Sequence, residues 1–385
     1  MLGLDQCRWH APQYAGGVGT RVGVAIVVAL ALAAPAAGAR PRTLAYTGGP
    51  VHAFAQDGGR IAWASLDDGS ACPWKIRVRT LVTRVQTAIT TAAGPTCRDE
   101  VGFQEPEWLV LALAGRRAAW TLFAQGNDTY RRVVTGAVAG GADRQVVELV
   151  YSNGDHIGDH LGGVAGDGRR LLFSQIQVGV GPPGCEGGDG DLSACDGEIR
   201  GGGVYRIEGA ARVAVPGAPP AIRLAVSGER LALVPAAAAR PPTAAPRVAP
   251  GAAVQIRALP GGGLVSTFAP VGTIRSLALS NRVAAVIVRR GAHTQIDAYN
   301  PTTGARLRTL TVPATATDLS AAGTRLVYRT GRRVWAASAV AGGPAPRLLA
   351  TAASEPIGLS IEGSRVAWAE NLSSGGRIQA VDLPS

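Results

Sequence analysis

The sequence predicts a seven-bladed β-propeller built from four-stranded sheets, and three observations lead to this fold class. A short pattern of an apolar run, a small-residue turn, an arginine and a second apolar run recurs along the chain. The copies are as far apart as propeller blades, and the last copy is one strand short. The composition agrees, because 46% hydrophobic residues, 52 Gly and 25 Pro supply a large core and many tight turns.

The first observation is the repeat itself. LSIEGSRVAWAE, which starts at Leu359, has relatives in FAQDGGRIAWAS from Phe54, LALAGRRAAWTL from Leu111 and VAGDGRRLLFSQ from Val164. Alignment on the arginine after the turn gives these positions: Arg60, Arg117, Arg170, Arg230, Arg282, Arg325 and Arg365. Their separations run from 40 to 60 residues, a period typical of propeller blades and too long for most solenoids.

The number of strands per copy supports a closed ring. After RLVYRT at Arg325 come RRVWAASA and PRLLATA before the next copy opens, which makes four strands per unit. Such small sheets must stack face to face around an axis to bury both faces. The last unit supplies only IGLSIEG, RVAWAE and RIQAVDL, and RTLAYTGG from Arg42 is the missing fourth strand. An open β-sandwich or a β-helix, the alternatives, would make no use of this closing strand.

The repeat resembles the TolB-type and WD-repeat-like propeller families. VAGDGRRLLFS in the third unit and LSAAGTRLVYRTGRRVWAAS in the sixth carry the likeness, which covers nearly all of residues 40–385. The chain departs from the family pattern because no turn contains its proline, and the aspartate is kept only at Asp57 and Asp167. The resemblance implies the fold and a habit of binding. The peptidase members of the family add a hydrolase domain, and this chain contains no Gly-x-Ser-x-Gly motif.

Aromatic residues recur at one place in the repeat, at Trp63, Trp120, Phe173, Tyr328 and Trp368. Period-two alternation points them between adjacent sheets, so we expect them to fill the core rather than to stack on a ligand. The aligned arginines are expected to brace the turns or to extend to solvent.

The N-terminus carries a predicted export signal. Arg21 precedes the apolar stretch VGVAIVVALALAAPAAGA, which ends in the small-x-small sequence Ala37-Gly38-Ala39. We therefore expect residues 1–39 to be a signal peptide cleaved near Ala39, and residues 40–385 to be a single exported domain, extracellular, periplasmic or in the cell envelope. An uncleaved anchor is the alternative, but the stretch is short for a span of about 20 residues. No stable membrane insertion is expected after cleavage.

The formal charge of +11 would favour nucleic acid as a partner, but its distribution does not. Lys75 is the only lysine, the arginines are dispersed, and aromatic residues are only 5% of the chain. Stacking platforms for bases are therefore scarce, and we expect a monomer that does not bind nucleic acid.

The connections between strands predict which face of the propeller is functional. The turns inside the repeat are one to three residues long, whereas the long loops, at residues 66–73, 91–106, 153–160, 178–200 and from Ala236, all fall on the opposite face. Function tends to lie on long loops held by a rigid scaffold, so we expect the site on this long-loop face, over blades one to four.

The cysteines fit the same map. Four remain after the signal peptide, an even number that favours disulfides in an exported chain. Because Cys72 and Cys97 both fall on the long-loop face, and Cys185 and Cys195 share one loop, we expect these two pairs. Each would stiffen its loop by about 2 to 4 kcal/mol.

Two groups of polar residues on these loops are candidate sites. The first is a candidate ligand or metal site at the channel mouth: His52, Glu105, Glu107, Asp155, His156, Asp159 and His160. The second has a composition like that of a calcium loop but not its spacing: Glu186, Asp189, Asp191, Asp196 and Glu198. The alternative is that these are solvated loop residues, and then no cofactor is needed.

Three functions remain open from the sequence. The first is a non-catalytic exported propeller that binds a protein, peptide or envelope glycan through the long-loop face. The second is a metal-assisted hydrolase, lactonase or lyase that uses His156, His160 and the neighbouring acids. The third is an envelope scaffold that organises partners through an apolar patch.

Overall fold

Antiparallel strands make up about two thirds of the chain that the computed structural model describes. The described residues are 40–66, 74–91, 95–98, 110–125, 128–152, 157–180, 197–237, 245–249 and 251–384. They belong to one unit, Gly38–Ser385. Their only helix is the single turn α1 (Pro95–Arg98). Within these ranges, no helix has the length and apolar character needed to cross a membrane.

The strands fall into groups of four that follow one another along the chain. The first groups are β2 (Val51–Asp57), β3 (Arg60–Leu66), β4 (Trp74–Thr80) and β5 (Gln86–Ala88); β6 (Leu111–Ala114), β7 (Arg117–Gln125), β8 (Asp128–Ala137) and β9 (Arg144–Ser152); and β10 (Gly158–Asp167), β11 (Arg170–Val180), β12 (Gly197–Glu208) and β13 (Ala211–Ala214). The pairing of Gly158 with Tyr151 joins the last two groups into one eight-stranded sheet.

The second half of the chain continues in the same way. Its strands are β14 (Ala221–Ser227), β15 (Arg230–Ala237), β17 (Val254–Ala258) and β18 (Leu264–Phe268), with β16 (Arg247–Val248) paired to β15; β19 (Thr273–Leu279), β20 (Ala284–Arg290), β21 (His293–Tyr299) and β22 (Arg306–Val312); β23 (Ala316–Ala322), β24 (Arg325–Thr330), β25 (Arg333–Ser338) and β26 (Arg347–Thr351); and β27 (Ile357–Glu362), β28 (Arg365–Leu372) and β29 (Gly375–Asp382).

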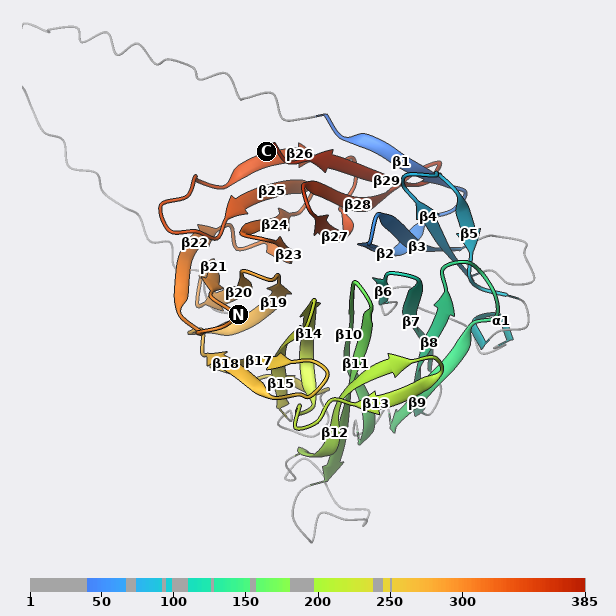
Figure 1. The fold of residues 1–385 in the computed structure, drawn as a ribbon, viewed down its shortest axis with the longest axis horizontal. Helices are drawn as coiled ribbons and strands as arrows, with labels where there is room; N and C mark the ends of the chain where they lie inside the picture. Colours follow the sequence, from blue (N-terminus) through green and yellow to red (C-terminus); the bar gives the residue numbers. More distant parts are fainter. Residues whose placement is uncertain are drawn as a thin grey trace, which may run out of the picture. The chain divides into compact units, whose positions relative to one another are not determined.

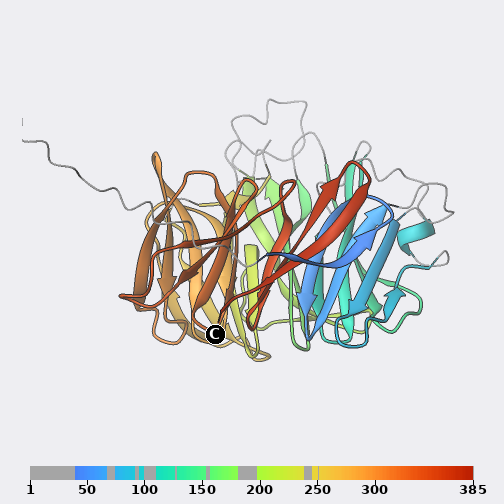
Figure 2. The same ribbon diagram turned by 90° about the horizontal axis from the view of Figure 1, so that it is seen from above.

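The sheets form a ring around a central axis (Figure 1). The first strand of each group is innermost, and β2 contacts β6, β6 contacts β10, and so on through β14, β19, β23 and β27, which returns to β2. Seen from the side, the inner strands run across the thickness of a disc (Figure 2). This arrangement hides the sheet edges at the centre, where each inner strand packs against its neighbours.

The first strand of the described chain completes the last sheet. β1 (Arg42–Thr47) pairs antiparallel with β29, so the order of this sheet is β1-β29-β28-β27. Its side chains alternate as a half-buried strand requires, with Ala45 3% exposed and Tyr46 73% exposed. Residues from the two ends of the described chain therefore share one sheet.

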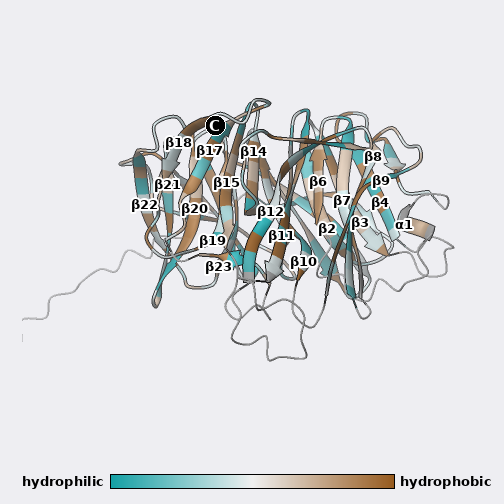
Figure 3. Cartoon of the chain, turned by 90° about the horizontal axis from the view of Figure 1, so that it is seen from below, coloured by the Kyte–Doolittle hydropathy of each residue, from teal (hydrophilic) through white to brown (hydrophobic). Residues whose placement is uncertain are grey.

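The recurring aromatic residues fill the spaces between sheets, as expected. Trp63, Trp120, Phe173 and Trp368 are fully buried and Tyr328 is nearly so. Trp63 packs with Ile378 of the last sheet, and the other aromatic residues occupy equivalent clusters between successive sheets. Hydrophobic stretches accordingly run along the strands through the body of the disc (Figure 3).

The two faces of the disc differ in how the strands are joined. We call the face on which the inner strands begin the entry face, and the face on which they turn back the turn face. On the turn face, two-residue turns such as Gly115-Arg116 and Gly168-Arg169 join the first strand of a group to the second. Gly115 has φ +56°, and a Cβ there would lie 2.4 Å from the Gly168 carbonyl oxygen, so only glycine fits this close approach.

The aspartate that the repeat keeps at residue 57 ties these turns together. Asp57 Oδ2 accepts a hydrogen bond from the Gly115 N–H at 2.6 Å, and its Oδ1 accepts one from the Gly168 N–H at 3.0 Å. Asp57 is only 7% exposed, so these charge-assisted bonds are shielded from water. One carboxylate of β2 thus holds the turns of the next two groups.

Two of the aligned arginines brace the turn face, one of the two roles expected from the sequence. Arg60 donates to the Gly115 carbonyl at 3.2 Å, and Arg170 donates to the Gly228 carbonyl at 2.8 Å. Each bond reaches the turn of the following group. Because the bonds cross between sheets, they fix one sheet against the next rather than stabilising a single hairpin.

The second repeat aspartate, Asp167, lies beside Asp57. Its Oδ2 accepts a hydrogen bond from the Gly228 N–H at 2.6 Å. Burial raises the pKa of the Asp167 carboxyl above its ordinary value of 3.8, and the neighbouring Asp57 raises it further, whereas the Gly228 N–H lowers it. The folded chain therefore favours the protonated acid. The contribution of the Asp167 carboxyl to the stability of the fold is full below pH 3.8 and is lost as the pH rises through its raised pKa.

Asp167→Asn is expected to raise the melting temperature relative to the wild-type chain, and to do so more near neutral pH than near pH 3. The amide oxygen still accepts from Gly228, while the charge that Asp57 repels is gone. Thermal melts across this pH range measure the difference. Glu229→Gln, in the neighbouring turn with an 84% exposed side chain, is the matched control and should show no such trend. An equal shift at both ends of the range would contradict the assignment.

Candidate functional site

The connections that leave the entry face are unequal around the ring. Those of the groups from β2 to β18 include residues 67–73, 89–110, 181–196 and 238–253. Between the groups from β19 to β29, the same face has only 291–292, 313–315, 331–332, 352–356 and 373–374. On the entry face, the structure thus separates a sector with long connections from one with only short turns.

His52 lies in strand β2, at the entry face. Its ring meets that of Trp74 edge to face, with the centroids 5.0 Å apart. Burial lowers the pKa of the His52 imidazole, so the ring stays neutral at pH 7. Its Nε2 is buried and has no hydrogen-bond partner in the part of the chain that the structure describes. In the neutral His52 ring, one nitrogen donates a hydrogen bond and the other accepts one, so Nε2 could bond to a ligand at the entry end of β2.

Asp159 and His160 are placed differently from the sequence expectation. They lie inside strand β10, not in the loop before it, and pair with Gln177 and Ile176 of β11. The antiparallel ladder with β11 has a bulge between Leu161 and Gly163 and continues beyond it to Gly158, so the strand includes Asp159 and His160.

His160 is a packed residue rather than an exposed loop histidine. It is 5% exposed, and its ring stacks on that of Tyr151 with the centroids 4.0 Å apart. The Arg131 guanidinium lies 5.9 Å from the centre of the same tyrosine ring and 5.6 Å from that of Phe123. These contacts anchor the strand ends of β7 to β10 at the entry face. The buried Oδ1 of Asp159 has no hydrogen-bond partner within the described ranges.

Several predicted site residues lie outside the described residues: Glu105, Glu107, Asp155, His156, Glu186, Asp189, Asp191 and Asp196. Glu198, predicted to lie in a loop, is an exposed residue of strand β12 opposite Gly179. Within the described ranges, no three histidine, cysteine or acidic side chains are grouped so that they could hold a metal. Of the candidate ligands, the structure therefore positions His52, Asp159, His160 and Glu198.

A buried network that the sequence reasoning missed fixes the helix α1 against the second group of strands. The Trp120 Nε1–H donates to Thr96 Oγ1 at 3.1 Å, and both the Thr96 hydroxyl and its N–H donate to Asp143 Oδ2. Thr96 is 1% exposed and Asp143 is 3% exposed. These hydrogen bonds hold the long connection 89–110 in place at Thr96. The one sign of this network is that Thr96 and Asp143 are polar and yet buried. Burial cannot be read from the sequence, so the network was not predicted.

Cys97, next to this network, is disulfide-bonded. Its expected partner Cys72, like Cys185 and Cys195, lies outside the described residues. The pairing of Cys72 with Cys97 and of Cys185 with Cys195 stays a prediction. Peptide mapping under non-reducing conditions is expected to recover these two linkages, and a linkage between the two pairs would contradict it.

The centre of the ring holds a cavity of about 240 Å³. It is lined by the inner strands, with residues such as Phe54, Leu113, Val226 and Leu279, and its polar side chains are Gln56, Ser320 and Ser360. No residue lining this cavity carries an acid or a base, so the described cavity offers no group for proton transfer.

Comparison with known proteins identifies similar folds. No family model and no curated protein matches the chain. Among solved structures, BamB from Moraxella catarrhalis matches with 12% identity over 86% of this chain and 85% of its own, with a TM-score of 0.44. The β-propeller domain of the Trilobed protease from Pyrococcus furiosus matches with 8% identity over 89% and 97%, with a TM-score of 0.49. TolB from Acinetobacter baumannii matches with 14% identity over 71% and 57%, with a TM-score of 0.37. The chain is similar to TolB- and BamB-like β-propellers at the level of fold.

Proposed function

We propose that the chain is a seven-bladed β-propeller whose last blade is closed by β1, that it is exported, and that it binds a protein or peptide through the entry face. The closed ring of inner-strand contacts and the pairing of β1 with β29 support the architecture. The sequence of residues 1–39 supports export. In this proposal the protein is a non-catalytic monomer.

One observation carries the binding function: the long connections leave one face and one sector of the ring. The strand ends beneath them are held by the contacts of His52 with Trp74 and of His160 with Tyr151, and by the bond of Trp120 to Thr96. Long connections on a rigid base are the usual arrangement of a recognition surface. The turn face of the same sector is occupied by hydrogen bonds between blades.

Shortening one connection tests this function. Val180 and Gly197 face each other across β11 and β12, so Asn-Gly in place of residues 181–196 leaves a two-residue hairpin and removes Cys185 and Cys195 together. Peptides selected by display against the full chain are expected to bind the shortened chain at least tenfold more weakly, a loss of about 1.4 kcal/mol. The melting temperature should stay close to that of the full chain.

The control replaces a short turn on the same face. Gly291-Ala292 joins β20 and β21 between the paired residues Arg290 and His293, and Asn-Gly there keeps the hairpin. The selected peptides should bind this variant as tightly as the full chain. If they bind the chain shortened at 181–196 equally well, the entry face of that sector is not the recognition surface. If the full chain binds glycans rather than peptides and the shortened chain does not, the entry face is still the recognition surface, but its ligand is a glycan.

A metal-assisted hydrolase, lactonase or lyase is a second candidate, and one observation favours it. Asp159 Oδ1 and His52 Nε2 are both buried at the entry face and have no hydrogen-bond partner among the described residues. A carboxylate oxygen binds calcium or zinc, and an imidazole nitrogen binds zinc. Elemental analysis of the purified chain is expected to find a stoichiometric metal that Asp159→Asn removes. Metal content that is absent, or unchanged by this substitution, would leave the binding function alone.

A further inference from the structure

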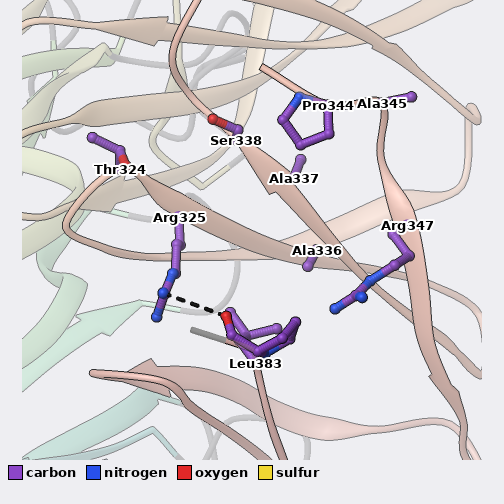
Figure 4. A pocket seen from close by; sticks show the side chains of 10 residues that line it. Thr324, Arg325, Ala336, Ala337, Ser338, Pro344, Ala345, Arg347 and Leu383 are labelled. Carbon is purple, nitrogen blue, oxygen red and sulfur yellow. Dashed lines mark hydrogen bonds between the residues drawn. The ribbon is translucent and has the colours of Figure 1, made fainter. Parts of the chain in front are cut away.

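A second cavity, on the turn face, lies far along the ring from the long connections. It has a volume of about 450 Å³ and is formed by β24, β25 and β26 together with the residues that follow β29 (Figure 4). Two residues mark its position on this face: Thr324 belongs to the turn between β23 and β24, and Ser338 is the last residue of β25. The volume is in the range of small-molecule sites.

Two arginines give this cavity its charge. Arg325 and Arg347 line it, and in Figure 4 their side chains border the space from opposite sides, with Ala336 between them. No acidic side chain lines it. The closest described acid along the chain, Asp382, is paired with Arg42 at 3.2 Å. The charge of the two guanidinium groups is therefore not balanced within the described cavity.

Arg325 differs from Arg60 and Arg170, which occupy the same place in two other blades. Arg60 and Arg170 donate to carbonyls of the next blade's turn at 3.2 and 2.8 Å. Arg325 meets the chain after β29 instead, and its one described hydrogen bond, to the Pro384 carbonyl, is 3.5 Å long. A bond of this length is weak. Arg347, on the exposed side of β26, has no hydrogen bond or ion pair with the described residues.

Apart from Thr324 and Ser338, the rest of the lining is apolar. Ala336, Ala337, Pro344 and Leu383 supply most of the remaining surface, and Ala337 and Leu383 are buried beneath it. A free inorganic ion would satisfy the guanidinium groups but leave this apolar floor in water. A neutral apolar molecule would cover the floor and leave both guanidinium groups unpaired.

We propose that this cavity binds a small organic oxyanion, in which a carboxylate or phosphate is attached to a short apolar group. The oxyanion accepts hydrogen bonds from the guanidinium groups of Arg325 and Arg347, whose planar forks match its oxygens. The apolar group lies over Leu383 and the alanines of β25. The site is on the opposite face from the proposed recognition surface and goes beyond the proposed function.

The test titrates the full chain with hexyl phosphate, hexanoate, 1-hexanol and inorganic phosphate, followed by calorimetry. Hexyl phosphate or hexanoate is expected to bind saturably, and 1-hexanol and inorganic phosphate at least tenfold more weakly. Arg325→Gln and Arg347→Gln should each weaken binding of the organic anion about tenfold, as the loss of a charge-assisted hydrogen bond implies. Added salt should weaken it as well.

Arg333→Gln is the matched control. Arg333 is an exposed arginine at the start of β25, the strand whose far end lines the cavity, so its loss changes the net charge equally without touching the site. Affinity should not change in this variant. If Arg325→Gln, Arg347→Gln and Arg333→Gln weaken binding equally, net charge and not the cavity explains the affinity, which contradicts the proposal. Tight binding of 1-hexanol would show that apolar contact alone explains it. Absence of saturable binding by any probe would overturn the proposal. The chain shortened at 181–196 should bind hexyl phosphate normally, which separates this site from the entry face.

Discussion

Trp120→Ala is expected to lower the free energy of unfolding by about 3–5 kcal/mol. The indole is fully buried with Ile76 and Val78 between the first two groups of strands, and Gly136 lies against its ring, so nothing nearby can fill the space it leaves. The substitution also removes the donor that holds Thr96. Urea or thermal unfolding followed by circular dichroism measures the loss.

A pair of milder substitutions separates packing from the hydrogen bond. Trp63 is equally buried, but its Nε1 has no hydrogen-bond partner among the residues that the structure describes, whereas Trp120 Nε1 donates to Thr96. Trp120→Phe should therefore cost about 1 kcal/mol more than Trp63→Phe. In addition, only Trp120→Phe should make the connection 89–110 easier to cleave by protease. Equal costs and equal protease resistance would show that the network does not anchor α1.

Ala45→Asp is expected to lower the free energy of unfolding by about 3 kcal/mol or more, because it places a charge with no partner in the core. Ala45 is 3% exposed on β1 and packs in one cluster with Trp63 and Ile378, where the last sheet meets the first. The loss depends on β1 occupying the outer edge of the last sheet. The measurement therefore tests the proposed closure as well as the packing.

Tyr46→Asp provides the control on the same strand. Tyr46 follows Ala45 but is 73% exposed, so the same aspartate should cost about 1 kcal/mol or less there, the range of strand propensities. Chemical denaturation of the two variants side by side gives the comparison. Similar losses for both would mean that β1 does not pack against β29, and the closed-ring architecture would have to be abandoned.

The strands and the core were accessible from sequence because they depend on local periodicity. Alternation along β28 points Trp368 into the core whatever the neighbouring sheet contributes, and the same holds for Trp63 in β3. The positions of the turns followed from glycine, which tolerates the positive φ found at Gly115 and Gly168. The limits of the long connections were less accurate. Glu198 belongs to β12, because pairing with β11 extends the strand into residues with no strand-like pattern.

The candidate site was accessible only in part. The sequence directed attention to His52, Asp159 and His160, but it placed Asp159 and His160 in a loop. Stacking on Tyr151 buries His160. Because Tyr151 lies in β9 and His160 in β10, no local sequence pattern predicts this contact. The sequence predicted the functional site on the opposite face, yet a cavity lined by two arginines lies on the turn face. Arg325 borders it because the chain after β29 returns to β24, a contact between residues far apart in sequence.

The sequence by itself determined the repeating strands, the glycine turns, the buried aromatic positions and the asymmetry of connection lengths. All of these rest on interactions within a few residues or on the two-residue period of a strand. The tertiary structure alone decided which groups meet across blades: Asp57 with the turns at Gly115 and Gly168, Trp120 with Thr96, and Arg325 with the cavity beside Pro384. Such contacts depend on how neighbouring elements pack in space, because each joins residues that are far apart in sequence.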